Sequence, residues 1–454
     1  MLTFLVETLG CKLNQLESEA ITDAFLKCGI RNVECVIEEG EKRAEDKERK
    51  PSVIVINTCT VTSKADQKAR RVIRKALRDY PDARVIVTGC YAQLNKDDIL
   101  KCGDGSQRLF VINKDKIIDY INDELGMTSD ESDIKNSTLI IPDLFHFNPK
   151  QFSKHTRAFL KIQDGCDKHC TYCKIRLARG KSVSLSAQEV LSRLLMLEEN
   201  HAEAVLAGVN ICQYSDQRKV NAEQRESDIT DLLDYLLSGT DKISIRLSSL
   251  APESIDEKLI KILNHPRIRP HFHLSVQSCC DKILERMGRV YNSKTVIKAV
   301  ELLRGAKQDP FLACDIITGF PGETEIEFNE TYETLKKLDF AWIHVFPYSK
   351  RKGTAAYNFF GAVHESDVTK RVNLLTELAL HGRTEYVKRW IGKEVEVITE
   401  KRDQRTGCYG LSENYLRIQI QCNGEISTAG TVLKCKLIKE GDGKDFDAVG
   451  RALI

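Results

Sequence analysis

Short apolar segments alternate with amphipathic segments along most of this chain, and no other feature restricts its fold as much. In the first third the apolar segments are residues 3–6, 53–56, 85–87 and 109–112. Continuous apolar runs of this length are typical of strands buried on both faces, as in parallel sheets. A helix is expected over 64–79, between the second and third runs. The alternation predicts a parallel α/β sheet domain over residues 1–135.

A second series of apolar runs follows a polar linker over 136–150. The runs are residues 158–162, 204–210, 243–249, 271–278, 312–320 and 342–346. Helical patterns separate them, which predicts a (βα)6 partial barrel domain over 151–387, with its site at the carboxyl ends of the strands. Residues 388–454 show short alternating strands and glycine-containing turns, so a small antiparallel β-barrel is expected there. The fold class is therefore α/β with a carboxyl-terminal barrel.

Three cysteines, Cys166, Cys170 and Cys173, stand in a C-x3-C-x2-C pattern directly after the first strand of the partial barrel. Thiolates are the usual ligands of iron–sulfur clusters, and a four-iron cluster normally takes four of them. Three local thiols therefore predict a cluster with one open iron that can bind a small molecule. Two alternatives stay open, a zinc site completed by His169 or a distant ligand, and inert packing of the thiols.

Three other cysteines, Cys11, Cys59 and Cys90, each follow a predicted strand of the first domain. The carboxyl ends of parallel strands meet at one edge of a sheet, where ligands bind. This placement predicts a second cluster with three protein ligands. Cys28, Cys35 and Cys102 lack the placement and are interpreted as structural.

The composition suits a chain that keeps its thiols reduced. Sixteen cysteines in 454 residues, without a signal peptide pattern or a run of 18 apolar residues, predict a cytoplasmic protein with no membrane segment. Residues 64–78 contain seven Lys or Arg and one Asp, and residues 154–181 contain eight against two Asp. Candidate phosphate contacts in these stretches are Arg71, Arg74, Arg179 and Lys181, although simple solvation is an equal interpretation of each. The last domain has twelve basic and ten acidic residues, so charge does not indicate RNA binding there.

Several strand-end motifs resemble those of the methylthiotransferases in the radical S-adenosylmethionine (SAM) superfamily. They are Gly208-Val209-Asn210, Gln277-Ser278, residues 315–323 (DIITGFPGE) and Phe346-Pro347-Tyr348-Ser349, together with the cysteine pattern. The resemblance covers essentially the whole chain. It implies a methylthiotransferase amino-terminal domain with an auxiliary cluster, a radical SAM core, and a TRAM-like barrel that grips tRNA.

The segments around the cysteines most resemble the subgroup that acts on N6-threonylcarbamoyladenosine-37 of tRNA. These segments are residues 9–14, 57–62, 89–93 and 165–173. The resemblance implies two 4Fe–4S clusters, with SAM as radical source and methyl donor, and insertion of a methylthio group at C2 of the adenine. It also implies the tRNA anticodon loop, an electron donor such as flavodoxin or ferredoxin, and a sulfur source as partners. No catalytic residue is assigned beyond the clusters.

Strand-end placement and resemblance together give the candidate SAM-binding residues. They are Tyr172, Gly208, Asn210, Ser248, Gln277 and Gly319. Asn210 and Ser248 could equally cap loops.

Two departures from the family pattern concern loops. Residues 174–180 replace an Ile-Pro-containing stretch, and Ser278-Cys279-Cys280-Asp281 replaces Ser-Gly-Ser-Asp, which puts the backbone beside Gln277 in question. Alternative functions are methylthiolation of N6-isopentenyladenosine-37, methylthiolation of a ribosomal-protein aspartate, or RNA binding with purely structural clusters.

Overall fold

The structure is a computed structural model, and it describes residues 2–33, 50–103, 105–124, 145, 156–216, 226–400, 408–421 and 429–453. The chain divides into two compact units. The first contains Met1–Ser153 together with Asp164–Cys166 and Lys174–Lys181, and the second contains the remainder. The predicted linker over 136–150 lies outside the described residues, apart from Phe145. None of the described helices is both long and apolar enough to cross a membrane.

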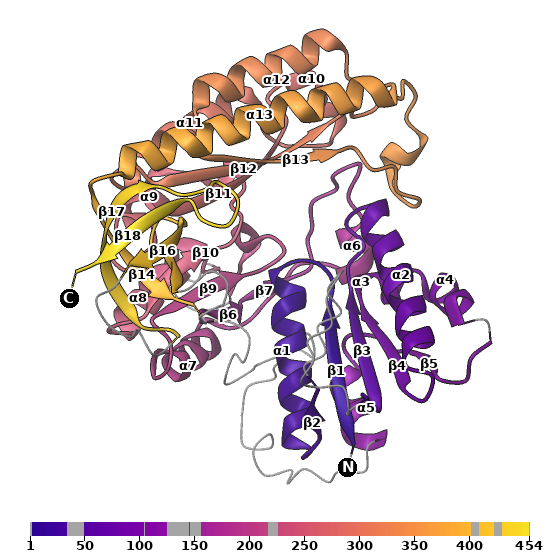
Figure 1. Cartoon of the computed structure of the whole chain (residues 1–454). Coiled ribbons are helices and arrows are strands. Elements are labelled where there is room, and N and C mark those ends of the chain that lie inside the picture. Colours follow the sequence, from indigo (N-terminus) through magenta and orange to yellow (C-terminus); the bar gives the residue numbers. More distant parts are fainter. Residues whose placement is uncertain are drawn as a thin grey trace. The chain divides into compact units, whose positions relative to one another are not determined.

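The first unit is built on a parallel sheet in the order β2-β1-β3-β4-β5, with helices beside it (Figure 1). The strands are β1 (Thr3–Thr8), β2 (Arg31–Asn32), β3 (Val53–Thr58), β4 (Arg84–Gly89) and β5 (Leu109–Val111). The helices are α1 (Lys12–Lys27), α2 (Ser63–Asp79), α3 (Cys90–Leu94), α4 (Lys96–Leu100) and α5 (Ile117–Glu124). The apolar runs form the core because β3 and β4 are covered on both faces, and Ile54, Ile56, Val85 and Val87 are completely buried. The predicted parallel sheet is confirmed.

The second unit contains the predicted series of six parallel strands. They are β6 (Ala158–Lys161), β9 (Glu203–Ala207), β10 (Ser244–Leu247), β11 (His271–Gln277), β12 (Phe311–Thr318) and β13 (Trp342–Pro347). Two three-stranded sheets, β10-β9-β6 and β11-β12-β13, are joined by parallel bridges at Ile245–Ile268 and Leu250–Leu274. The expected (βα)6 partial barrel is therefore confirmed.

Helices follow the strands of this partial barrel. They are α7 (Ala187–Glu198), α8 (Ile229–Gly239), α9 (Glu257–Leu263), α10 (Asp281–Arg286), α11 (Ser293–Ala306), α12 (Glu325–Leu338) and α13 (Glu365–Trp390). Between β6 and α7 lie the short elements β7 (Gln163–Asp164), α6 (Ile175–Arg179) and β8 (Val183–Ser184).

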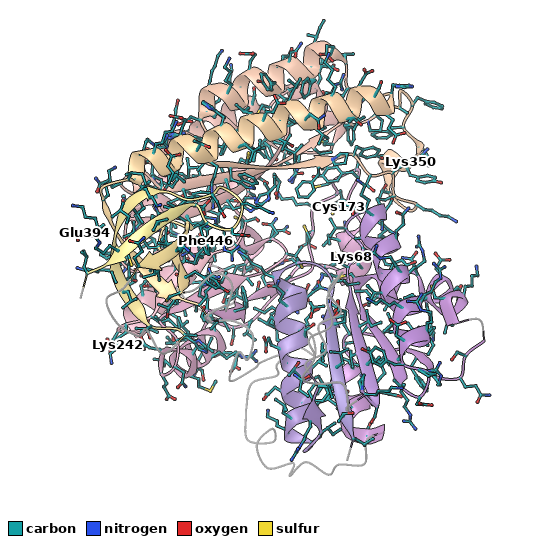
Figure 2. All side chains as sticks on the ribbon, viewed as in Figure 1. Lys68, Cys173, Lys242, Lys350, Glu394 and Phe446 are labelled. Carbon is teal, nitrogen blue, oxygen red and sulfur yellow. The ribbon has the colours of Figure 1, made fainter. Side chains whose placement is uncertain are left out.

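The carboxyl-terminal segment forms a closed barrel in the order β14-β15-β16-β18-β17. Its strands are β14 (Glu394–Thr399), β15 (Tyr409–Ser412), β16 (Arg417–Gln421), β17 (Val432–Glu440) and β18 (Ala448–Ala452). Figure 2 labels Glu394 and Phe446 of this barrel. The predicted small barrel is confirmed, with one difference. β16 and β18 pair in parallel, because β18 closes the barrel by inserting between β16 and β17.

Helix α13 joins the partial barrel to this small barrel through a shared core. The helix runs along β13 and continues to Trp390, past the boundary predicted at residue 387 (Figure 1). Tyr386 and Trp390 of α13 pack in one cluster with Phe311 of β12 and with Val395 and Leu416 of the barrel region. The two segments predicted as separate domains therefore belong to one compact unit.

Candidate functional site

The loop with the C-x3-C-x2-C pattern follows β7, and its backbone requires glycine at the entrance. Gly165 has a φ of +71°, and a Cβ atom there would overlap the carbonyl oxygen of Lys181. The Cys166 amide donates to the Gly180 carbonyl over 3.1 Å. The loop thus begins against the segment that follows it, at the carboxyl end of the first barrel strands, as predicted.

The middle of the same loop is fastened to the second unit around Thr171. Its amide donates to the Met287 carbonyl and its hydroxyl to the Arg286 carbonyl, both over 2.9 Å, and its carbonyl accepts from the Ala356 amide over 2.8 Å. The ring of Tyr172 lies edge-on to Phe320, with 6.4 Å between the ring centroids. Cys170 and Cys173 flank these anchored residues, and both are partly exposed (Figure 2 labels Cys173).

The predicted SAM-binding residues stand at successive strand ends of the partial barrel. Gly208 follows β9, Ser248 follows β10, Gln277 ends β11 and Gly319 follows β12. The Ser248 hydroxyl is buried and has no hydrogen-bond partner among the described residues, which leaves a donor and acceptor for a ligand. The Asn210 amide donates to Gln163 Oε1 over 2.9 Å, so its backbone is fixed while its side chain does not cap the short helix after it.

The backbone has a positive φ at the last residue of β11 and at the residue directly after β12. Gln277 has a φ of +66° after a register shift in β11, and Gly319 has a φ of +75°. The Gly319 amide donates to Glu323 over 2.6 Å, and Arg371 holds that carboxylate at 2.8 Å. The Ser-Cys-Cys departure does not impose strain, because Cys279 is buried with ordinary negative φ and its amide donates to Thr331 over 3.2 Å. The unusual backbone is at Gln277 itself.

The three thiols predicted to hold the second cluster lie near one another at the carboxyl edge of the sheet of the first unit. Cys11 follows β1, Cys59 follows β3, and Cys90 begins α3 directly after β4, and these three strands are neighbours. A Cβ atom on Gly10 would stand 2.6 Å from Cβ of Cys59, so the two loops touch. Burial, opposed by the Val61 amide and reinforced by the charges of Cys11 and Cys90, raises the pKa of Cys59 to about 12. Thiols that interact in this way fit ligands of one shared group.

Among the described residues, no three His, Cys, Asp or Glu side chains are grouped tightly enough to hold a single metal ion. A zinc ion would draw thiolates to about 2.3 Å from itself. A four-iron cluster holds each thiolate on a different iron and therefore separates its ligands more widely. The cluster interpretation and the zinc alternative both remain predictions.

Arg179 corrects one sequence-based prediction. It was expected to contact RNA phosphate, but the side chain is only 1% exposed and its donors are used inside the first unit. Nη1 contacts Glu17 at 3.0 Å and Asp164 at 3.1 Å, and Nε donates to Sγ of Cys90 over 3.2 Å. Arg179 is buried because it pairs with acidic side chains from other parts of the sequence. A local count of basic residues does not detect such pairing.

The other three candidate phosphate contacts are at the surface. Arg71 and Arg74 are exposed on α2, and Lys181 is exposed after α6. Helix α2 buries Ala69, Val72, Ile73 and Ala76 on one face, so its basic residues gather on the other, where Figure 2 labels Lys68. RNA contact by this basic face remains a prediction.

The structure also reveals site residues that the sequence analysis missed. Asn14 accepts from the Cys11 thiol over 3.2 Å and donates to Asn57 and the Thr58 carbonyl over 3.1 Å, linking the first two thiol loops. Glu17 is buried on α1. The sequence contains a signal of this burial, because Glu17 stands four residues from both Leu13 and Ile21 and therefore lies within the apolar stripe of the helix. Helix α1 begins at Lys12, directly after Cys11.

Comparisons with known proteins agree with this architecture. A family model described as "Radical SAM superfamily" matches residues 160–335, and one described as "Uncharacterized protein family UPF0004" matches residues 3–110. The chain also resembles a cobalamin-dependent S-adenosylmethionine radical enzyme, OxsB, in its apo, SeMet-labelled form. That structure gives a TM-score of 0.50 at 14% identity and covers 83% of this chain and 56% of the other, so it shows likeness of fold alone.

Three curated relatives match nearly full length. A Treponema pallidum protein named "Threonylcarbamoyladenosine tRNA methylthiotransferase MtaB" is 35% identical over 97% of this chain and 99% of its own. A Thermotoga maritima protein of the same name is 33% identical, over 92% and 91%. An Anaplasma marginale protein named "tRNA-2-methylthio-N(6)-dimethylallyladenosine synthase" is 28% identical, over 96% and 94%.

Proposed function

Because this chain belongs to the radical SAM methylthiotransferase family, we propose that its substrate is N6-threonylcarbamoyladenosine-37 of tRNA and that it inserts a methylthio group at C2 of the adenine. The observation that carries the choice of nucleoside is the 35% identity, over 97% of the chain, to a relative named for this modification. The relative named for the dimethylallyl nucleoside matches at 28%.

Membership of the radical SAM family implies one 4Fe–4S cluster and SAM. We assign the cluster to Cys166, Cys170 and Cys173, whose loop is fixed by Thr171. SAM bound there supplies the 5′-deoxyadenosyl radical that this superfamily uses. The buried Ser248 hydroxyl, the backbone at Gly208 and Gln277, and the other candidates at strand ends then hold and orient SAM.

A second cluster in the first unit completes the proposal. Cys11, Cys59 and Cys90 come from three adjacent strand ends, and their thiols interact electrostatically. Three thiolates leave one iron free to hold the sulfur that is inserted. An electron donor such as flavodoxin or ferredoxin and a source of sulfur are required as partners.

The tRNA is proposed to contact the basic face of α2, Lys181 and the carboxyl-terminal barrel. Exposed cations attract a phosphate backbone, and they would hold the anticodon loop while adenosine-37 leaves its stack. The last domain has only two more basic than acidic residues, so the proposed contribution of the barrel rests on its TRAM-like form.

The nucleoside assignment is tested by mass spectrometry of tRNA nucleosides from a strain that lacks this gene. We expect loss of the methylthio form of N6-threonylcarbamoyladenosine and accumulation of its precursor. Loss of the methylthio form of N6-isopentenyladenosine instead would show the alternative substrate. An unchanged tRNA profile with an altered ribosomal-protein aspartate would overturn the tRNA assignment altogether.

Complementation of that strain tests the radical mechanism. Cys170→Ala removes a proposed cluster ligand, so we expect no detectable methylthio nucleoside, a loss of at least a hundredfold. Cys102→Ala is the matched control, since Cys102 is a partly exposed thiol whose hydrogen bond goes to the Asp98 carbonyl. It should restore the modification. Product formation by Cys170→Ala would refute the assignment of the cluster and the radical mechanism that depends on it.

A further inference from the structure

Arg179 lies at the centre of a buried ionic network in the first unit. Its guanidinium contacts Glu17 and Asp164, and Asp164 in turn accepts from Lys114 Nζ over 3.1 Å. The four side chains are each no more than 3% exposed. A charge is buried at a large cost unless it is paired and hydrogen-bonded, so this network is a specific construction and not incidental packing.

The network uses the separate nitrogens of arginine for different partners. Nη1 faces the two carboxylates, whereas Nε donates to Sγ of Cys90 over 3.2 Å. The two cations and two carboxylates of these four side chains balance one another. Arg179 therefore presents Cys90 with a directed hydrogen bond, while its charge is largely compensated by Glu17 and Asp164.

The same residues bracket the three-cysteine loop in the sequence. Asp164 precedes Cys166, and its carboxylate also accepts from the Gly165 amide over 2.7 Å. Arg179 ends α6, shortly after Cys173. The contact with Cys90 is thus made by chain segments that enter and leave the other cysteine loop, and these segments belong to the first compact unit.

We propose that Arg179 is a positioning residue of the auxiliary cluster, and that its Nε–H bond to the Cys90 sulfur raises the reduction potential of that cluster. The inference rests on the second cluster of the proposed function. A hydrogen bond to a ligating sulfur withdraws electron density and stabilises the reduced, more negative state, and such bonds are among the main determinants of cluster potentials. The sulfur-bearing cluster is thereby easier to reduce than it would be with three unbonded thiolates.

The experiment isolates the auxiliary cluster in the full-length chain. Cys166, Cys170 and Cys173 are replaced together by alanine, the protein is reconstituted anaerobically, and the remaining cluster is titrated with dithionite while its EPR signal is recorded. Arg179→Lys is then introduced. Lysine keeps the positive charge for Glu17 and Asp164 but lacks the fork that reaches the sulfur. We expect the reduction equilibrium to shift about tenfold toward the oxidised state, which is about 59 mV for one electron.

The matched control is Arg246→Lys. Arg246 is an equally buried arginine with two hydrogen bonds to Glu203, and it belongs to the second unit. It should leave the potential unchanged. An unchanged potential in Arg179→Lys, with the cluster present, would overturn the inference and leave Arg179 a structural residue. A triple-alanine protein that binds no iron or sulfide would overturn the second cluster itself, which is a distinguishable failure.

A second measurement needs no substitution at Arg179. Protein labelled with 15N-arginine is examined by pulsed EPR in the reduced triple-alanine background. A hyperfine coupling from an arginine nitrogen to the cluster is expected, because Nε lies within hydrogen-bond distance of Cys90. Absence of the coupling would refute the hydrogen bond even if the Arg179 variants failed to fold.

Discussion

Two glycines beside the three-cysteine loop both have a positive φ but differ in their surroundings. Gly165 has a φ of +71° and Gly180 a φ of +76°. A Cβ atom on Gly165 would overlap the Lys181 carbonyl oxygen, whereas one on Gly180 would meet no atom within 4 Å. Both positions therefore strain a residue with a side chain, and of the two only Gly165 adds a close approach to another backbone segment.

We expect Gly180→Ala to cost about 1–3 kcal/mol of unfolding free energy, because its φ of +76° and ψ of −161° lie in a region that essentially only glycine adopts. Gly165→Ala should cost clearly more, because the loop entrance must also move away from Lys181. Urea unfolding of both variants measures this difference, and iron content after reconstitution shows whether the loop still holds its cluster. Equal unfolding midpoints and equal iron content in the two variants would contradict the close approach seen at Gly165.

At the residue scale, the sequence predicts the placement of the first-unit cysteines but not the burial of Arg179. The placement of Cys11, Cys59 and Cys90 followed from strand ends, because topology alone brings neighbouring parallel strands to one edge. The environment of Arg179 did not follow, since its partners Glu17 and Asp164 are 162 and 15 residues away along the chain. A basic residue in a basic stretch was assigned to the surface, and only the fold shows that it is buried.

At the scale of the element, helix α2 carries the clearest candidate surface for nucleic acid. Thr62 caps it by accepting from the Ala65 amide over 3.1 Å, and four small or branched apolar residues fix its inner face. Its position directly after the Cys59 loop was expected from the sequence, as were its bounds to within a residue or two. The proposal that its outer face binds RNA rests on the positive charge of that face alone.

Reversal of charge on that face tests the expectation. In the double variant Arg71→Glu, Arg74→Glu we expect tRNA affinity to fall at least tenfold at low salt, with a shallower dependence on salt by about one unit of slope per lost phosphate contact. Fluorescence anisotropy across a range of KCl concentrations gives both quantities. Lys336→Glu, Lys337→Glu on α12 is the control, since both lysines are exposed on another helix. If the two double variants bind equally, α2 is only a solvated face.

At the scale of the whole second unit, buried ion pairs within the partial barrel are extended by a partly exposed pair that reaches the small barrel. Glu203 of β9 accepts from Arg246 over 2.7 Å and from Arg269 over 2.9 Å, and Arg269 also contacts Glu396 of β14 at 2.5 Å. Burial alone would raise the pKa of Glu203, but the charge and hydrogen bond of Arg246, followed by Arg269, outweigh it and lower the pKa to about 2.

A carboxylate with a lowered pKa stabilises the fold above its unfolded pKa, about 4.3, and that contribution is lost as pH falls toward 2. Glu203→Gln should therefore cost about 3–5 kcal/mol at pH 7, because two arginines stay buried without their partner. The difference from the unsubstituted protein should shrink below pH 4. Urea unfolding of cluster-free protein at pH 7 and pH 3 measures it. Glu385→Gln, at an exposed pair with Lys388, should change neither value. A difference that is constant with pH would contradict the role of Glu203.

The sequence predicted every parallel strand series correctly, but not how its segments combine into units. The alternation of apolar and amphipathic segments predicts strands and helices, because the residues that an element buries recur with the period of that element. It does not reveal that the apolar face of α13 continues into Tyr386 and Trp390, which pack against both barrels. The sequence pattern changes near residues 387 and 388, where a domain boundary is predicted, but both residues lie inside one helix.

This shared core limits which segments of the chain can be replaced by segments of another protein during evolution. A barrel brought in from another protein at residue 388 would leave Phe311 and Tyr386 facing side chains that had not adapted to them. The hydroxyl of Tyr386 also donates to the Asp309 carbonyl over 2.9 Å and accepts from Asn414 over 3.2 Å, so it contacts both sides at once. Residues of this core lie on both sides of Glu365 and of residue 388, so an exchange at either point would bring together side chains that had not adapted to each other.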